Sequence, residues 1–406
     1  MAGRGALVGA VVSAAASVLI GGAGYSERGA PLPAMFGQEV TRSTLHDQVV
    51  QALGSAVDPE QRIRLAEHLF FARAELRARP PSPELRALVR ELFDLEEVVR
   101  LAGPAQSGWT MRQPGFEGVH SLQTGDVILV RGAPTTPVLA EVTEVSAGAA
   151  QSPYSHTIVA ARDPKTGAVN LIESQEPHGF REGPAQEALL SEYARVVVLR
   201  LREPVARQEA GQRLTKELPE LRRQGHVPYN SWLDDDDPHR LNCGQLARRL
   251  LGPQYPAERT TLDDGMANYA RRAGMRATTM VLPGDFERDG RFEIVAEGSN
   301  PTLLREVRLR EAATLAVFRR QSAGLPVLEP SPVALRLEAA TRWLLSLGVV
   351  AELNDRVVGA AIDLRRVTHT AVAALGLLRA SHADTQGGRP PTAREMARHL
   401  DDGQSR

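Results

Sequence analysis

The sequence has one cysteine, few aromatic residues and almost no net charge. Cys243 is the only cysteine among 406 residues, which excludes an internal disulfide and a zinc site built from several cysteines. The 48 basic and 49 acidic residues are interspersed along the chain, so no nucleic-acid partner is expected. Any thiol chemistry in this chain therefore depends on Cys243.

The length exceeds the size at which one hydrophobic core stops growing, so several structural units are expected. Changes in composition and in the spacing of apolar residues along the chain suggest where these units lie. We predict a linker over 27–40, a helical region over 41–114, a mixed α and β region over 115–300, a second helical region over 301–380 and a flexible tail over 381–406.

Helix signals mark both flanks. Asp58-Pro59 and Ser82-Pro83 are typical helix starts, and apolar residues follow each at helical spacing. Beyond residue 300, helices are predicted over Leu303–Arg320, Pro332–Leu347 and Val350–Ala380. Charged residues interrupt the last stretch, which excludes a membrane span there.

Short β-branched runs separated by turn residues predict strands in the central region. The runs are GDVILV (125–130), HTIVAARD (156–163), VNLIES (169–174), RVVVLRL (195–201), Arg276–Leu282 and, after a turn at Pro283-Gly284-Asp285, Phe292–Ala296. The region is therefore expected to be α+β.

The first 26 residues contain one arginine followed by an uncharged stretch rich in alanine, glycine and valine, ending in small residues. This pattern is typical of an export signal, with a weakly hydrophobic membrane anchor and a plain flexible N-terminus as the alternatives. We expect an exported protein, periplasmic or extracellular, associated with the membrane if the segment is an anchor.

Cys243 is predicted to begin a helix. Asn242 and Gln245 have the spacing of a capping box, and Gly252 supplies a stop after LARRLL. The positive end of the helix dipole favours a thiolate there, as a nucleophile requires. The alternative is a free cysteine packed as a small apolar residue.

His156 is the histidine best placed to serve as a base, because it opens a predicted strand. A turn at Asp163–Gly167 folds the following strand back, so that Glu173 or Ser174 lies opposite His156, depending on whether a bulge shifts the register. Glu173 is preferred because a carboxylate stabilises imidazolium. His178 is a weaker rival base on a loop.

The acidic run Asp234–Asp237 lacks the alternate spacing and closing glutamate of a calcium loop. We interpret it as a solvated acidic turn, and we expect neither a metal nor a cofactor.

Four motifs in order, GDVILVRG, YSH opening a strand, IES closing a hairpin and PYNSWLDDDDPHRLNCGQL, resemble the permuted papain-like thiol hydrolases, the YiiX-like branch of the NlpC superfamily. In that family the histidine precedes the cysteine. The resemblance covers about residues 120–300, including LPGDFERDGRFEIV, which is similar to the family's closing strand segment.

The resemblance implies an α+β, circularly permuted papain-like core with an antiparallel sheet and a nucleophile helix. It also implies Cys243 as nucleophile, His156 as base and then acid, and Glu173 as the polar third member, with Tyr154 and Asn242 in support. Where the family has YCSEL, this chain has NCGQL, which keeps the helix cap but replaces the aromatic residue and the acid.

The expected function is that of a cysteine hydrolase, of the peptidase or amidase class, cleaving an amide or ester bond. Its substrate would be a peptide-like or lipid-like acyl compound. Peptidoglycan stem peptide is the first expectation and a lipid ester or amide, with hydrolysis or acyl transfer, the second. A non-catalytic binding or scaffold protein of the cell envelope is the alternative of a different class.

Overall fold

A computed structural model describes Leu69, Arg73 and residues 83–101, 108–132, 154–175, 178–186, 189–230, 239–261 and 279–308. The chain divides into two compact units, one of residues 1–106 and 387–392 and the other of residues 107–386 and 393–406. The predicted export signal, the linker, the helix start at Asp58-Pro59, the acidic run, the helical stretches beyond residue 308 and the tail lie outside the described residues.

Helix α4 (Pro83–Leu101) belongs to the first unit and begins at the predicted proline. Its core positions, such as Leu92, are fully buried. Glu96 forms a buried ion pair with Arg73 at 3.3 Å and a second pair with Arg100 at 2.6 Å, one turn further along α4. The predicted helix is therefore confirmed, and charged residues as well as apolar ones contribute to its buried surface.

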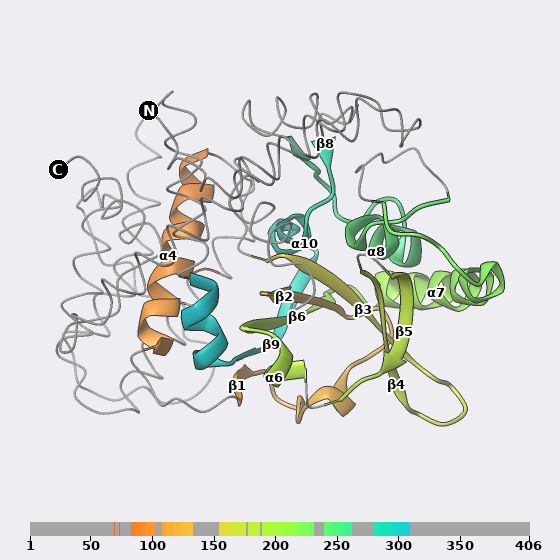
Figure 1. Cartoon of the computed structure of the whole chain (residues 1–406), viewed down its shortest axis with the longest axis horizontal. Coiled ribbons are helices and arrows are strands. Elements are labelled where there is room, and N and C mark those ends of the chain that lie inside the picture. The colour runs from red at the N-terminus through yellow and green to blue at the C-terminus, as the bar shows by residue number, and fades with distance from the viewer. Residues whose placement is uncertain are drawn as a thin grey trace, which may run out of the picture. The chain divides into compact units, whose positions relative to one another are not determined.

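A seven-stranded antiparallel sheet forms the centre of the second unit (Figure 1). Across the sheet, the strands are β1 (Gly108–Arg112), β9 (Phe292–Ser299), β6 (Arg195–Leu201), β2 (Val127–Arg131), β3 (His156–Arg162), β4 (Val169–Gln175) and β5 (Gly179–Pro184). A separate two-stranded ladder pairs β7 (Thr260–Thr261) with β8 (Thr279–Met280). The second unit is thus α+β, as predicted.

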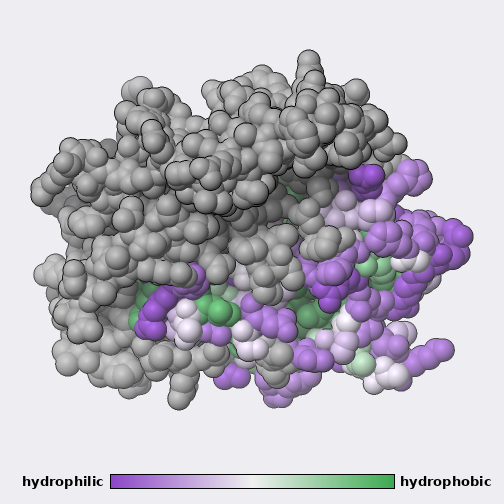
Figure 2. All heavy atoms as spheres, viewed as in Figure 1, coloured by the Kyte–Doolittle hydropathy of each residue, from purple (hydrophilic) through white to green (hydrophobic). Residues whose placement is uncertain are grey.

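Three helices pack on one face of the sheet (Figure 1). Helix α8 (Cys243–Leu251) contacts β3 and β4, α7 (Pro204–Gln224) contacts β6, and α10 (Pro283–Arg288) contacts β2. Buried leucines of α7 point to the core, whereas hydrophilic side chains cover its exposed surface (Figure 2). The position of α8 brings its first residue, Cys243, to the start of β3.

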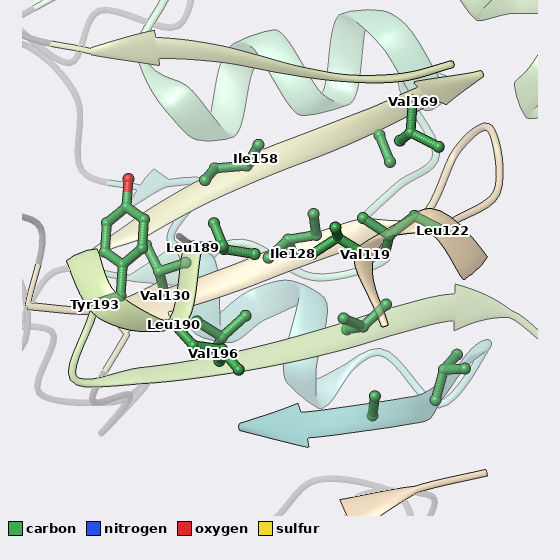
Figure 3. Close-up of a cluster of buried hydrophobic side chains, with 14 of the residues drawn as sticks. Val119, Leu122, Ile128, Val130, Ile158, Val169, Leu189, Leu190, Tyr193 and Val196 are labelled. Atoms are coloured by element: carbon green, nitrogen blue, oxygen red, sulfur yellow. The ribbon is translucent and has the colours of Figure 1, made fainter. Parts of the chain in front are cut away.

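The opposite face holds an apolar core beneath the short helices η1 (Val119–Ser121) and α6 (Leu189–Glu192). Figure 3 shows Val130, Ile158 and Val196 from three adjacent strands packed together in this core, with Tyr193 beside them. Alternate residues of each strand face opposite sides of a sheet. Because both faces are covered, β2 and β6 are apolar at nearly every position, which explains the uninterrupted runs in the sequence.

The structure corrects several sequence predictions. The sheet begins at Gly108 rather than near residue 115, and β1 and β5 were not foreseen. Among the described residues 279–282 of the strand predicted over Arg276–Leu282, only Thr279 and Met280 pair. Pro283-Gly284-Asp285 starts helix α10 instead of a turn, because Asp285 accepts a hydrogen bond from the Leu282 N–H at 2.8 Å and so caps a helix.

Candidate active site

Cys243 is the first residue of α8, and the predicted capping box is confirmed. Asn242 Oδ1 accepts a hydrogen bond from the Gln245 N–H, and Gln245 Oε1 accepts one from the Asn242 N–H, each at 2.8 Å. Gly252 ends the helix at the predicted position. The cap satisfies two backbone donors at the helix start and fixes the direction in which Cys243 leaves it.

The segment before α8 is tied to the same cap. Asn230 Nδ2 donates to Gln245 Oε1 at 3.1 Å, and the Leu241 N–H donates to Pro228 O at 3.1 Å. The PYN residues of the motif therefore support the helix start from outside. This role was not evident in the sequence, because it depends on contacts between positions about fifteen residues apart.

His156 opens β3, as predicted, and its Nε2 lies 2.8 Å from Glu173 Oε2 on β4. The predicted contact is present, but both predicted registers are wrong. The β3–β4 ladder runs from Val159–Ile172 to Arg162–Val169, so the same register extended to His156 would put it level with Gln175.

The loop between β3 and β4 explains this difference. The Asp163 N–H donates to Ala168 O, which adds Ala168 to the predicted turn. The true register differs by two residues from the one that pairs His156 with Glu173, so both side chains stay on one face and meet diagonally. Ser174, the other candidate, faces the opposite side and donates to Leu241 O at 2.5 Å.

Cys243 completes the group, since its thiol hydrogen-bonds the His156 ring. Because Glu173 engages Nε2, the bond to sulfur falls to Nδ1. The backbone N–H groups of Thr157 and Gly244 also point to the sulfur. The β3–β4 ladder stops at Val159, so β4 does not accept a hydrogen bond from the Thr157 N–H. The Cys243 sulfur accepts that hydrogen bond instead.

The two ionisable groups stabilise each other's charged forms. Burial alone would lower the pKa of His156, but hydrogen bonds to Cys243 and Glu173 and the negative charge of both raise that pKa to about 10. Burial alone would raise the pKa of Cys243, yet the hydrogen bond and positive charge of His156, with the two backbone donors, lower it. The site thus favours a thiolate and an imidazolium.

Glu173 stays ionised in this setting. Burial opposes its charge, but the hydrogen bond and positive charge of His156, followed by the charges of Arg181 and His178, lower the pKa of Glu173. Arg181 stands directly across from Glu173 in the β4–β5 ladder. Burial raises the pKa of Tyr193, and the negative charge of Glu173 raises it further. The phenol of Tyr193 therefore lies near the Glu173 carboxylate.

Two further predicted residues lie near the site in the sequence. Tyr154 is buried two residues before His156. His178, the rival base, is exposed before β5, and the histidine that hydrogen-bonds Cys243 is His156. The sequence did not point to Arg181 or Tyr193. Arg181 lies on β5, whose glycine and proline content resembles that of a loop. Tyr193 is distant from Glu173 in the sequence, and only the tertiary fold brings the two residues together.

Gly244 carries a constraint that the sequence did not reveal. A Cβ built on it would lie 2.5 Å from Val281 O and 3.0 Å from Val281 Cγ1. Only glycine lets the first turn of α8 approach the segment before α10 this closely. Gly244 is thus needed for packing next to Cys243.

No cluster of three metal-ligating side chains occurs among the described residues. Likewise, no helix in the described part of the chain is long and apolar enough to cross a membrane.

Comparisons of the chain with family models, with curated proteins and with solved structures gave no match.

Proposed function

We propose that this protein is a thiol hydrolase acting on an amide or ester through Cys243, His156 and Glu173. The observation that carries the proposal is the His156 ring, which hydrogen-bonds the thiol on one side and a carboxylate 2.8 Å away on the other. Nucleophile, base and orienting group in hydrogen-bonded order are the arrangement that thiol catalysis requires.

In the proposed mechanism, the Cys243 thiolate attacks the carbonyl carbon, and the C–S bond forms as the carbonyl oxygen becomes an oxyanion. His156, already protonated, then donates its proton to the leaving nitrogen or oxygen, and the C–N or C–O bond breaks to leave a thioester. Neutral His156 next removes a proton from water, whose oxygen attacks the thioester and releases the acid and the thiolate.

Each supporting residue has a task in this cycle. Glu173 holds the ring through Nε2 and so keeps Nδ1 directed at the sulfur. The Gly244 and Thr157 N–H groups stabilise the thiolate before attack. The cap bonds of Asn242 do not use the N–H of Cys243, which serves as a donor to the oxyanion.

The finer identity follows the sequence resemblance. The order of histidine before cysteine, the antiparallel sheet and the cysteine at a helix start support assignment to the permuted papain-like thiol hydrolases. The export-like segment over residues 1–26 supports a cell-envelope substrate, with peptidoglycan stem peptide proposed first.

The test is incubation of the wild-type protein and the Cys243→Ala variant with peptidoglycan fragments and, separately, with phospholipid vesicles. Mass spectrometry would follow both the products and the mass of the protein. The proposal expects a new acid product and an acyl adduct on Cys243 with the wild-type protein only. Products that persist in Cys243→Ala would contradict it, and a wild-type protein that binds these substrates without cleaving them would favour the scaffold alternative.

A further inference from the structure

Arg181 is a cation on β5, the strand at the edge of the sheet next to β4 (Figure 1). It stands directly across from Glu173 in the β4–β5 ladder, and residues paired in this way project from the same face of a sheet. His156 meets Glu173 on that face, so Arg181 leaves the sheet on the side that carries the imidazole. Its side chain is exposed, whereas His156 and Cys243 are buried, so a ligand can reach it.

A hydrogen bond turns the Arg181 guanidinium toward the end of β4 that lies beside the thiol. Arg181 Nη1 donates to Gln175 Oε1 at 2.5 Å, and Gln175 is 6% exposed. Gln175 lies two residues beyond Glu173 on the same face, level with His156 in the extended β3–β4 register. The charge of Arg181 also acts on Glu173 and on the Tyr193 phenol. The guanidinium is therefore held beside the site while it remains accessible to solvent.

Most of this guanidinium is available to a ligand. In the part of the chain that the structure describes, Gln175 is the only hydrogen-bond partner of Arg181, and no carboxylate forms an ion pair with it. Glu173, across the ladder, uses its Oε2 for His156. Arginine carries five N–H donors in a fixed fork that matches the two oxygens of a carboxylate. A neutral glutamine thus aims the fork without neutralising its charge.

The distance across the sheet decides which part of a substrate Arg181 could contact. Strand β4 separates β5 from β3, and neighbouring strands lie about 4.8 Å apart, so β5 is roughly 10 Å from the strand that carries His156. A group bound by Arg181 is therefore several bonds away from the carbonyl that Cys243 attacks. Arg181 would recognise a part of the substrate that does not react.

We propose that Arg181 is a specificity residue that binds a carboxylate of the substrate, several bonds from the scissile carbonyl. The inference rests on the proposed hydrolase function and names its substrate class, acyl compounds that carry a free carboxylate. Arg181 takes part in no covalent step. Two parallel N–H···O bonds to the carboxylate orient the acyl chain so that its carbonyl lies at the sulfur. A peptide-like substrate with a free carboxylate fits this site better than a neutral ester does.

The test uses two pairs of reagents that differ only in one carboxylate. Mono-4-nitrophenyl adipate and 4-nitrophenyl hexanoate acylate the thiol and release 4-nitrophenolate, and only the adipate ester has a carboxylate at the far end of its chain. 4-(Iodoacetamido)butanoate and N-butyl iodoacetamide alkylate the same thiol and differ in the same way. For each pair, the measured quantity is the rate with the anionic reagent divided by the rate with its neutral partner at pH 7. Changes in thiol reactivity cancel in this ratio.

In the wild-type protein, both ratios should exceed those measured for 2-mercaptoethanol, a small thiol with no binding site. In Arg181→Gln, both should fall by about 10-fold, since the variant loses a hydrogen-bonded charge partner. Arg181→Lys keeps the charge but not the fork, so its ratios should lie between those of the wild type and Arg181→Gln. Arg223→Gln is the matched control, because Arg223 is exposed on α7 and pairs with Glu220, and its ratios should equal those of the wild type.

Wild-type ratios no higher than those of 2-mercaptoethanol would overturn the inference. So would Arg181→Gln ratios equal to those of the wild type, even if all four rates fell together, because Arg181 would then act only through Glu173. If Arg181→Gln does not fold, Arg181→Lys decides, and ratios that stay at the wild-type values in that variant would overturn the inference.

Failure of the underlying function has a different signature. A wild-type protein that both iodoacetamides alkylate, but that releases 4-nitrophenolate from neither ester, would contradict the hydrolase proposal. The alkylation ratios would still show whether Arg181 binds a carboxylate near the thiol, so the two failures are distinguishable.

Discussion

His156 Nε2 lies 2.8 Å from Glu173 Oε2, although the two residues do not stand directly opposite each other in the β3–β4 ladder. The diagonal contact occupies the ring nitrogen remote from sulfur and leaves Nδ1 to Cys243. One carboxylate therefore selects which nitrogen meets the thiol, and its charge helps to keep the ring protonated.

Replacing His156 is expected to make Cys243 an ordinary buried thiol. His156→Ala removes the positive charge and hydrogen bond that lower the thiol pKa, so iodoacetamide labelling at pH 7 should slow by about 10- to 100-fold. His178→Ala is the matched control, since His178 is exposed, and its labelling curve should remain that of the wild type. An unchanged labelling curve for His156→Ala would mean that another group activates the thiol.

Glu173→Gln tests the carboxylate charge. The variant removes a negative charge that raises the pKa of His156, so that pKa should fall from about 10 by roughly one unit or more. The alkaline limb of acyl transfer, where imidazolium loses its proton, should move to lower pH in a pH–rate profile. Glu182→Gln alters a carboxylate on β5 that pairs with Arg222, and it should leave the limb in place. If the alkaline limb lies at the same pH in Glu173→Gln and Glu182→Gln, the charge of Glu173 does not raise the pKa of His156, and Glu173 has a purely structural role.

Two glycine substitutions should have opposite effects on stability. Gly244→Ala forces a Cβ against Val281 in the first turn of α8, and we expect a loss of about 1–3 kcal/mol in the free energy of unfolding, with slower labelling of Cys243. Gly211→Ala lies inside α7 with its nearest neighbouring atom 3.9 Å away, so it should gain about 0.5–1 kcal/mol. Denaturant titration measures both, and a neutral Gly244→Ala would show that α8 can move away from Val281 at little cost.

The linked titration of the pair sets a pH window for stability. The pKa of His156 is raised from 6.5 to about 10, so its contribution is complete below pH 6.5 and is lost as the pH rises toward 10. The pKa of Cys243 is lowered from 9.0, so its contribution is complete above pH 9.0 and is lost as the pH falls through the folded value. Between these limits the two slopes oppose each other.

We therefore expect the difference in the free energy of unfolding between the wild-type protein and a Cys243→Ala, His156→Ala double variant to be nearly constant between pH 6.5 and 9.0. It should decrease on both sides of this range. Denaturant titrations at a series of pH values measure the difference, and a steady slope across the range would show that the folded pair does not hold one proton between its two members.

Local signals were enough to predict the helix of Cys243 and the strand of His156. The capping box, the glycine stop and the β-branched runs each depend on neighbouring residues, and each was found in the structure. The contact between His156 and Glu173 was also predictable, because a hairpin brings nearby residues together. Its register was not, since one backbone bond, from Asp163 to Ala168, decides the length of the loop.

Long-range features left no comparable signal in the sequence. Strand β1 is held by β9, far away in the chain, and its five residues carry no clear alternation. Edge strand β5 has the glycine and proline content of a loop, which hid Arg181. The tight approach of Gly244 to Val281 depends on how α8 lies against the segment before α10. Such contacts follow from tertiary packing, and local patterns do not encode them.

The most direct test of the central claim is the rate of iodoacetamide alkylation of the wild-type Cys243 as a function of pH, followed by intact mass. If the thiol is a thiolate paired with imidazolium, the rate should level off below the ordinary thiol pKa of 9.0 and change little from there up to about pH 9. A rate that rises about tenfold per pH unit toward the ordinary thiol pKa of 9.0 would contradict the account.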